Sequence, residues 1–280
     1  MLPGEARGYV DQALEIPSVE WVSLTGGEPF LVPETLSELV SYASRRGLKT
    51  ECVTNCFWAS TPGEARRTLG ALADAGLTAV NISCDDFHQR HISFDRVDNC
   101  FNAAKELGLK MVIMCATSKS SELGIREVAR RLGEDEIHVL GDVEPKGRVS
   151  ALGVETGFIP AGRGEDISSE ELVLGKSPVE GPCHTVLRDM GIAPSGRVLP
   201  CCSAGTVVEE LGLGNAKDAE LRELIEAAQG RPVFRTLMNR GPLAMMEALG
   251  PVSRGEYVSR CHICYEVVRH PRLNEALESL

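Results

Sequence analysis

Five of the ten cysteines stand in the last third of the 280-residue chain, at a spacing typical of a metal site. They are Cys183, Cys201, Cys202, Cys261 and Cys264, and the last two form a Cys-x-x-Cys pair. Such a pair together with distant thiolates suits a tetrahedral four-sulfur site, which holds either Zn²⁺ or an iron-sulfur cluster. The spacing alone does not choose between the two.

A glycine-rich segment near the N-terminus could hold a ligand of a different kind. Gly26 and Gly27 let the backbone come close to a ligand, and Glu28 and Pro29 follow them directly. Phosphate binding needs N–H donors, whereas a glutamate adds negative charge and a proline removes a donor. Glu28, expected on a surface loop, therefore suits a cationic amine.

The elements that would position these residues alternate regularly between strand and helix. Apolar runs predict strands at 19–24, 48–54, 78–83, 110–115 and 137–140, and helical spacing predicts helices at 5–15, 34–46, 63–75, 94–107 and 125–132. Strict alternation implies parallel strands with right-handed crossovers. The continuous apolar run at 110–115 predicts a strand buried on both faces. This alternation is compatible with a doubly wound sheet or with a full or partial (β/α) barrel.

Polar residues follow the predicted strands at the edge where parallel α/β proteins bind ligands. Asn55 follows the second strand, and Ser83 and Asp85 end the third. We expect the thiols of three further residues at strand ends to line the same pocket: Cys56, Cys84 and Cys115. The sequence therefore outlines one site at this edge.

Beyond about residue 183 the alternation of strands and helices is lost and the cysteines cluster. Residues 141–182 are rich in glycine, proline and charge, and a hairpin with its turn at Ser195-Gly196 is predicted over 192–200. We expect a first domain over residues 1–170 and a small cysteine-rich domain over 171–280. The predicted fold is thus α/β, a partial (β/α) barrel followed by a cysteine-rich domain.

Composition narrows the class of protein. The net charge of −11 argues against a general nucleic-acid binder, and 43% hydrophobic with 25% charged residues is typical of a globular chain. No apolar run is long enough for a membrane span, and no signal peptide is recognisable, so a cytoplasmic location is expected. In a reducing cytoplasm ten cysteines favour metal or redox roles over disulfides.

The ordered set of motifs resembles the radical S-adenosylmethionine (radical SAM) superfamily. It consists of Gly26-Gly27-Glu28-Pro29, Thr54-Asn55 and Ser83-Cys84-Asp85, each at a successive strand end. The resemblance implies that the Gly-Gly-Glu-Pro segment receives the SAM amino group. It also implies that Asn55, Ser83 and Asp85 hold the ribose and carboxylate, and that Gly162-Arg163 (less favoured, Gly147-Arg148) forms a later part of the SAM site.

The sequence departs from this superfamily in one respect. The catalytic [4Fe–4S] cluster of the family is held by CxxxCxxC, and no cysteine precedes Gly26. Cys52 and Cys56 form only a CxxxC pair, so they do not replace the triad. We interpret the first strand and its cluster loop as missing through truncation, and expect the chain as given not to cleave SAM.

The C-terminal cysteines resemble the SPASM and twitch extensions that bind auxiliary [4Fe–4S] clusters. The resemblance includes Leu213-Gly214-Asn215 between the hairpin and the Cys-x-x-Cys pair. Five cysteines supply one four-cysteine site with either Cys201 or Cys202 to spare, and Cys201 follows the hairpin more directly.

The function implied is a radical SAM enzyme that modifies a peptide or other natural-product precursor. A flavodoxin- or ferredoxin-like protein would be its reductant, and no nucleic acid or membrane partner is expected. The alternative is a non-catalytic iron-sulfur or zinc protein that retains the fold. A barrel hydrolase or transferase is disfavoured because no Ser/His/Asp or paired-carboxylate constellation stands out.

Overall fold

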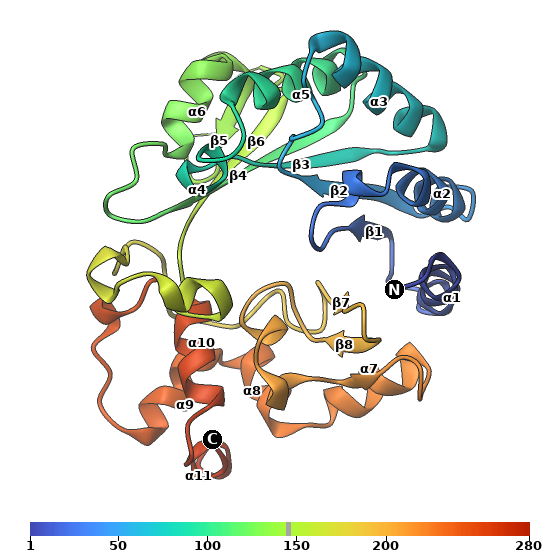
Figure 1. Ribbon diagram of the computed structural model, residues 1–280. Coiled ribbons are helices and arrows are strands. Elements are labelled where there is room, and N and C mark those ends of the chain that lie inside the picture. The colour runs from blue at the N-terminus through green and yellow to red at the C-terminus, as the bar shows by residue number, and fades with distance from the viewer. Residues whose placement is uncertain (144–146) are drawn as a thin grey trace. The chain divides into compact units, whose positions relative to one another are not determined.

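The computed structural model describes residues 1–143 and 147–280, without the side chains of residues 134 and 163 (Figure 1). The chain divides into two compact units. The sheet unit comprises residues 3–10 and 17–156, and the cysteine unit comprises 157–280 together with 1–2 and 11–16. None of the helices in the described residues is long and apolar enough to cross a membrane.

A six-stranded sheet forms the centre of the sheet unit, with strand order β1-β2-β3-β4-β6-β5. Its strands are β1 (Trp21–Leu24), β2 (Lys49–Thr54), β3 (Ala79–Ser83), β4 (Lys110–Thr117), β5 (Ile137–Val139) and β6 (Ala151–Gly157). The pairs β1–β2, β2–β3, β3–β4 and β5–β6 are parallel. The predicted alternation of parallel strands and helices is confirmed.

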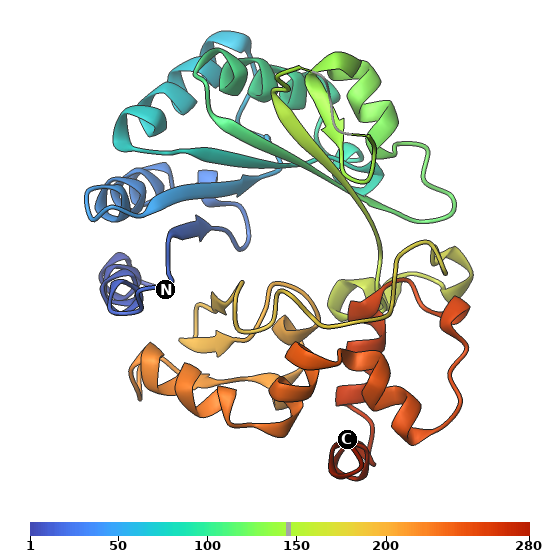
Figure 2. The ribbon, with the colours of Figure 1, turned by 180° about the vertical axis from the view of Figure 1, so that it is seen from behind.

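Four helices of this unit pack on one face of the sheet. The helices of the described residues up to β5 are α1 (Pro3–Leu14), α2 (Pro33–Ser44), α3 (Pro62–Ala75), α4 (Asp86–Gln89), α5 (Phe94–Glu106) and α6 (Ile125–Leu132). Buried side chains of α2, α3, α5 and α6 share one hydrophobic cluster with those of β2, β3 and β4. Figures 1 and 2 show these helices on the same side of the sheet. One-sided cover is the arrangement of a partial (β/α) barrel, whereas a doubly wound sheet has helices on both faces.

Local sequence explains where these helices begin and end. The Thr61 hydroxyl accepts a hydrogen bond from the Glu64 N–H and so caps α3, and Pro62 follows at the first position. Helix α3 ends at Gly76, whose φ of 111° is in the left-handed region.

Burial alternates along the central strands. In β4, Met111, Ile113 and Cys115 are buried, whereas Val112 and Met114 are half-buried. The expectation that this strand is buried on both faces was therefore wrong, because only one face of the sheet is covered by helices of its unit.

Strand β6 lies between β4 and β5, and no strand was predicted at its position. The strand was not predicted because two glycines, Gly153 and Gly157, weaken the apolar pattern by which a strand is recognised. A Cβ at Gly153 would lie 2.9 Å from Ile125 Cγ1 and 3.1 Å from Ile137 Cγ2. Close packing against α6 and β5 thus requires a glycine within a strand.

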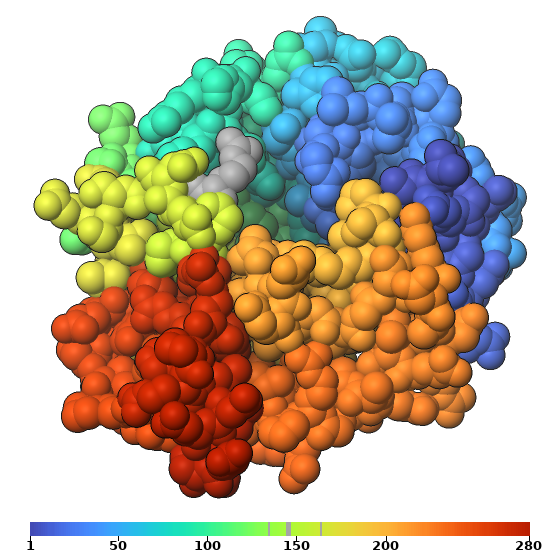
Figure 3. All heavy atoms as spheres, turned by 60° about the horizontal axis from the view of Figure 1, so that its bottom comes forward, coloured from blue at the N-terminus to red at the C-terminus, as the bar shows by residue number. Residues whose placement is uncertain are grey.

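The cysteine unit contains a three-stranded sheet and five helices in its described residues. Strands β7 (Gly191–Ile192), β8 (Arg197–Leu199) and β9 (Gly214–Asn215) pair antiparallel in that order. The helices are α7 (Leu221–Gln229), α8 (Pro232–Asn239), α9 (Pro242–Leu249), α10 (Arg260–Val268) and α11 (Leu273–Glu278). Helices α10 and α11 both pack on α9, and Figure 3 shows the surface that these last helices form in red tones.

The predicted hairpin is confirmed. Gly196 has a φ of 92°, and its N–H donates to the Ala193 carbonyl over 2.8 Å. The Leu213-Gly214-Asn215 segment supplies β9, the third strand. The hairpin ends at Pro200, so Cys201 is fixed directly after it.

Candidate functional site

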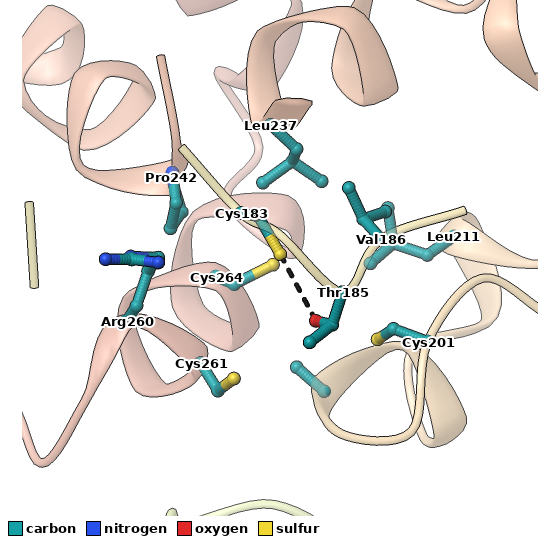
Figure 4. Close-up of a pocket in the computed structure, with 11 residues that line it drawn as sticks. Cys183, Thr185, Val186, Cys201, Leu211, Leu237, Pro242, Arg260, Cys261 and Cys264 are labelled. Atoms are coloured by element: carbon teal, nitrogen blue, oxygen red, sulfur yellow. Dashed lines mark hydrogen bonds between the residues drawn. The ribbon is translucent and has the colours of Figure 1, made fainter. Parts of the chain in front are cut away.

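Four cysteines of the cysteine unit line one small pocket (Figure 4). Cys183 precedes the hairpin, Cys201 follows it, and Cys261 and Cys264 lie in the first turns of α10. An i, i+3 spacing places the last two on one face of their helix. In Figure 4 the four sulfur atoms point into the same space. The remainder of the lining is mostly apolar and comprises Thr185, Val186, Ala204, Leu211, Leu237, Pro242 and Arg260.

The arrangement of these thiols bears on the kind of metal group that the pocket could hold. In the parts of the chain that the structure describes, no three His, Cys, Asp or Glu residues are grouped as ligands of one metal ion. A zinc site needs all its thiolates about 2.3 Å from a single point. A [4Fe–4S] cluster instead takes its four thiolates on four separate irons.

The turn after Cys201 donates hydrogen bonds to two of the sulfurs. Burial raises the pKa of Cys201, and the backbone N–H groups of Ser203 and Gly205 offset part of that rise. Burial likewise raises the pKa of Cys261, while the Ser203 hydroxyl and the Ala204 N–H lower it. Donors aimed at sulfur stabilise the thiolate, which is the form that binds metal.

Gly205 allows this turn to approach the sulfur. A Cβ on Gly205 would lie 2.9 Å from Cys201 Sγ and 2.7 Å from Pro200 Cγ. Sequence reasoning missed the Ser203–Gly205 turn and Arg260. The available signals were a glycine shortly after the Cys201-Cys202 pair and an arginine directly before the Cys-x-x-Cys pair.

Neighbouring thiols raise the pKa of Cys201, Cys261 and Cys264. Burial raises the pKa of Cys264 well above its ordinary value, and the nearby Cys261, Cys201 and Cys183 raise it further. Several thiolates can share this pocket only if a cation compensates their charge.

Cys202 and His262 are not among the residues that line the pocket. Cys202 is exposed and is not among the lining residues. His262 is buried, accepts a hydrogen bond at Nδ1 from the Val258 N–H (3.2 Å), and its Nε2 lies 3.2 Å from Glu266 Oε1. Both ring nitrogens of His262 are therefore engaged, so it is not available as a metal ligand.

In the sheet unit, the loop after β1 is joined to the end of β2 by Glu28. Gly26 and Gly27 have φ values of 89° and 54°, which only glycine adopts readily. Glu28 Oε2 accepts from the Asn55 N–H at 2.8 Å, and Oε1 accepts from the Phe30 N–H at 3.4 Å. Pro29 begins the short helix η1 (Pro29–Leu31). The half-buried carboxylate retains acceptor sites for a further donor.

Asn55 and Ser83 share the half-buried face of the sheet. Thr54 pairs with Ile82 in the register of β2 and β3, so the next residues along, Asn55 and Ser83, follow side by side. Asn55 Oδ1 accepts from the Phe57 N–H at 3.0 Å, which fixes the side chain at the strand end. The structure thus brings together Glu28, Asn55 and Ser83 at the predicted edge.

Asp85 is a buried helix cap. Its Oδ1 accepts from the N–H groups of Phe87 and His88 and lies 2.9 Å from His88 Nδ1, and its Oδ2 accepts from the Ala116 N–H at 3.4 Å. Burial acts to raise the pKa of Asp85, but the His88 and Ala116 contacts outweigh it and lower the pKa. These contacts hold α4 against β4, and a SAM role for Asp85 rests on the sequence pattern alone.

The prediction for Arg163 falls on a side chain outside the described residues. Its neighbour Gly162 begins the short helix η3 (Gly162–Asp166) with a φ of 57°.

The strand-end thiols do not line this site. Cys56, Cys84 and Cys115 are buried in the hydrophobic cluster beneath the helices, on the opposite face from Asn55. Burial raises the pKa of Cys84 to about 12, and the Cys115 thiol donates to the Leu123 carbonyl at 3.3 Å. The expectation that they line the pocket was wrong, because strand alternation directs them into the core.

Two family profiles match the chain. The radical SAM superfamily profile matches residues 1–132, and the SPASM profile, an iron-sulfur cluster-binding domain, matches residues 183–265. The second range contains all five C-terminal cysteines. No curated protein sequence matches the chain.

Solved structures give only distant likenesses. A candidate lyase/mutase from Burkholderia cenocepacia J2315 is 14% identical with a TM-score of 0.30, over 53% of this chain and 72% of that one. A candidate fructose-1,6-biphosphate aldolase from Coccidioides immitis is 16% identical with a TM-score of 0.30, over 55% of this chain and 48% of that one. Likenesses at this level do not bear on the site.

Proposed function

Because the chain belongs to the radical SAM superfamily and carries a SPASM iron-sulfur cluster-binding domain, we propose that it acts on a peptide or another natural-product precursor. The cofactors of the superfamily are SAM and a [4Fe–4S] cluster, and SPASM domains bind auxiliary clusters. The observation that carries the proposal is the pocket lined by Cys183, Cys201, Cys261 and Cys264 within the residues that the SPASM profile matches.

The cofactors, when bound, supply the reductive cleavage of SAM to methionine and a 5′-deoxyadenosyl radical, with one electron from a flavodoxin- or ferredoxin-like protein. The chain's own residues hold SAM in place. Glu28 accepts hydrogen bonds from the SAM ammonium, and Asn55 and Ser83 hold its ribose and carboxylate. The neighbouring positions of these three side chains support this assignment.

The auxiliary cluster is assigned to the four cysteines of the pocket. Cys201 is the ligand of the adjacent pair, since Cys202 is exposed and lies outside the lining. Hydrogen bonds from the Ser203–Gly205 turn offset part of the cost of burying thiolates. The donors of this turn directly follow one proposed ligand, Cys201, and also reach a second, Cys261. Hydrogen bonds to the ligand sulfurs are typical of iron-sulfur sites.

The 280 residues contain no CxxxCxxC motif. Cys52 and Cys56 are fully buried in the core of the sheet unit, and burial raises the pKa of both thiols. They are therefore poor substitutes for the catalytic cluster ligands. We expect these 280 residues alone to bind SAM without cleaving it, and a chain that also includes the triad to form 5′-deoxyadenosine.

Calorimetric titration with SAM tests the binding half of this proposal. Glu28→Ala should weaken SAM binding by about 1.5–3 kcal/mol, the range for hydrogen bonds to charged groups. It should also cost about 1 kcal/mol of stability, because the Asn55 N–H loses its acceptor. Glu34→Ala, in the first turn of α2, is the matched control and should leave binding unchanged.

Anaerobic reconstitution followed by reduction tests the chemical half. Liberation of 5′-deoxyadenosine by the 280 residues alone would contradict the assignment of catalysis to a CxxxCxxC segment. A chain that binds one zinc ion and no SAM would instead support the second candidate, a non-catalytic zinc or iron-sulfur protein.

A further inference from the structure

Arg260 is held rigidly beside the cysteine pocket. Its Nη1 donates to the Pro182 carbonyl at 2.7 Å, and its Nη2 donates to the Glu180 carbonyl at 2.6 Å. Both acceptors belong to the segment that leads directly into Cys183. The planar guanidinium therefore joins the first residue of α10 to the Cys183 segment in one orientation.

The segment that receives Arg260 is itself fixed. The Cys183 N–H donates to the Leu237 carbonyl at 2.8 Å. Gly241, with a φ of 83°, packs against Gly181 so closely that a Cβ on Gly241 would lie 1.9 Å from the Gly181 carbonyl oxygen. Because both acceptors are fixed, the direction of the N–H on the third guanidinium nitrogen of Arg260, Nε, is fixed too.

That third donor has no acceptor. Arg260 Nε is buried and makes no hydrogen bond within the described part of the chain, although Arg260 lines the pocket together with Cys183, Cys261 and Cys264 (Figure 4). A buried, unpaired donor on a charged group is costly, and native proteins rarely leave one without a ligand. Among the lining side chains, the groups that can accept a hydrogen bond are the four cysteine sulfurs and the Thr185 hydroxyl.

We propose that Arg260 Nε–H donates a hydrogen bond to a sulfur of the auxiliary cluster or of its thiolate ligands, and that it raises the reduction potential of that cluster. This inference rests on the assignment of the auxiliary cluster to the four-cysteine pocket. Arg260 is a positioning and tuning residue, since it is not itself a ligand.

The electrostatic reason is direct. One-electron reduction adds one negative charge to the cluster and neither forms nor breaks a covalent bond. A nearby cation and a hydrogen bond to sulfur both stabilise the more negative state, so they raise the potential. Consistently, the charge of Arg260 lowers the pKa of Cys261, although burial outweighs that effect.

Arg231 supplies a matched control in the same unit. Its Nη1 and Nη2 donate to the backbone carbonyls of Gly212 (2.9 Å) and Glu210 (2.5 Å), but Arg231 is not among the pocket-lining residues. Loss of Arg231 removes a comparable clamp without touching the cluster.

The test is a redox titration with dithionite, followed by EPR, on the whole chain after anaerobic iron-sulfur reconstitution. Arg260→Gln should retain iron and lower the midpoint potential by the equivalent of roughly tenfold in the equilibrium constant, about 59 mV for one electron. Arg260→Lys keeps the charge and loses the Nε donor, so its midpoint potential should lie between those of the wild type and Arg260→Gln. Arg231→Gln should match the wild-type potential.

Two results would overturn the inference. Equal potentials in the wild type and both Arg260 variants would show that no hydrogen bond reaches sulfur. Loss of the cluster from both Arg260 variants, but not from Arg231→Gln, would show that Arg260 only clamps the Cys183 segment. A wild-type chain that takes zinc and no iron would instead contradict the proposed function.

Discussion

The sheet unit and the cysteine unit contain the same number of cysteines, but the groups that surround the thiols differ. Five lie in the sheet unit, all of them buried, and five lie in the cysteine unit, four of them around one pocket. Burial raises the pKa of thiols in both units: Cys52, Cys56, Cys84 and Cys115 in the sheet unit, and Cys201, Cys261 and Cys264 around the pocket. In the described part of the sheet unit, the Arg131 charge opposes this rise at Cys84 without outweighing it, and Cys115 acts as a thiol donor to a carbonyl. In the pocket, N–H and hydroxyl donors point at sulfur.

This difference shows that burial and proximity alone do not make a metal site. Cys56 lies close to Cys84 and Cys100, yet its surroundings are the aliphatic side chains of the core. A thiol in such surroundings stays protonated and packs as a small apolar group. Donors aimed at sulfur, together with a cavity, distinguish the second group.

Removal of the metal should have the largest effect and should affect one unit alone. Without a cation, the mutual repulsion of four buried thiolates opposes closure of the pocket, so the cysteine unit should lose most of its amide exchange protection after chelation. The sheet unit should keep its protection. Hydrogen exchange measured by mass spectrometry on holo and chelated chain distinguishes the two.

Both tryptophans, Trp21 and Trp58, lie in the sheet unit and provide an independent control. The wavelength of their emission maximum should not change on chelation. Equal loss of protection in both units would contradict the comparison, because it would show that the sheet unit also depends on metal.

Gly205→Ala should have the next largest effect. The added Cβ would meet Cys201 Sγ at 2.9 Å and Pro200 at 2.7 Å, so the turn must move and its N–H donors with it. Most of the reconstituted iron should be lost, as measured by iron content and visible absorption. Gly70→Ala in α3, where the Cβ meets nothing within 4 Å, should retain iron and stabilise the sheet unit by about 1 kcal/mol. Full iron in Gly205→Ala would show that the turn is dispensable.

The smallest effect concerns Asp85 and depends on pH. Because the folded-state pKa of Asp85 is lowered, its charge contributes stability that is fully present above about pH 4 and is lost as the pH falls through the folded-state pKa. Asp85→Asn should therefore cost about 1–2 kcal/mol at pH 7, and the difference from wild type should shrink below pH 4. Urea unfolding followed by tryptophan fluorescence at several pH values measures it. A cost independent of pH would mean that the carboxylate charge is unimportant.

Much of the sheet unit was predictable from periodicity and helix ends. The helix over 125–132 and the strand start at Lys110 agree with the sequence-based expectation. Strand β6 was not predictable, since its Gly153 is explained only by side chains of α6 and β5 that pack against it. Non-local packing overrides local propensity at such positions.

The candidate site, too, was predictable from the sequence only in part. The spacing of the C-terminal cysteines indicated a metal pocket, while the donors from the Ser203–Gly205 turn depend on a loop conformation that spacing does not encode. The face of each strand-end thiol follows from strand parity. Cys84 has the parity of Val80 and Ile82, which are core residues, so its inward direction could have been inferred from the alternation itself.

The central claim is that the pocket cysteines, and not the core cysteines, hold the cluster. Two matched double variants test it after anaerobic reconstitution: Cys261→Ala with Cys264→Ala in the pocket, and Cys84→Ala with Cys115→Ala in the core. Iron and sulfide analysis should give about four irons per chain for the wild type and the core variant, as for one [4Fe–4S] cluster, and none for the pocket variant. Full iron in the pocket variant together with its loss from the core variant would contradict the account.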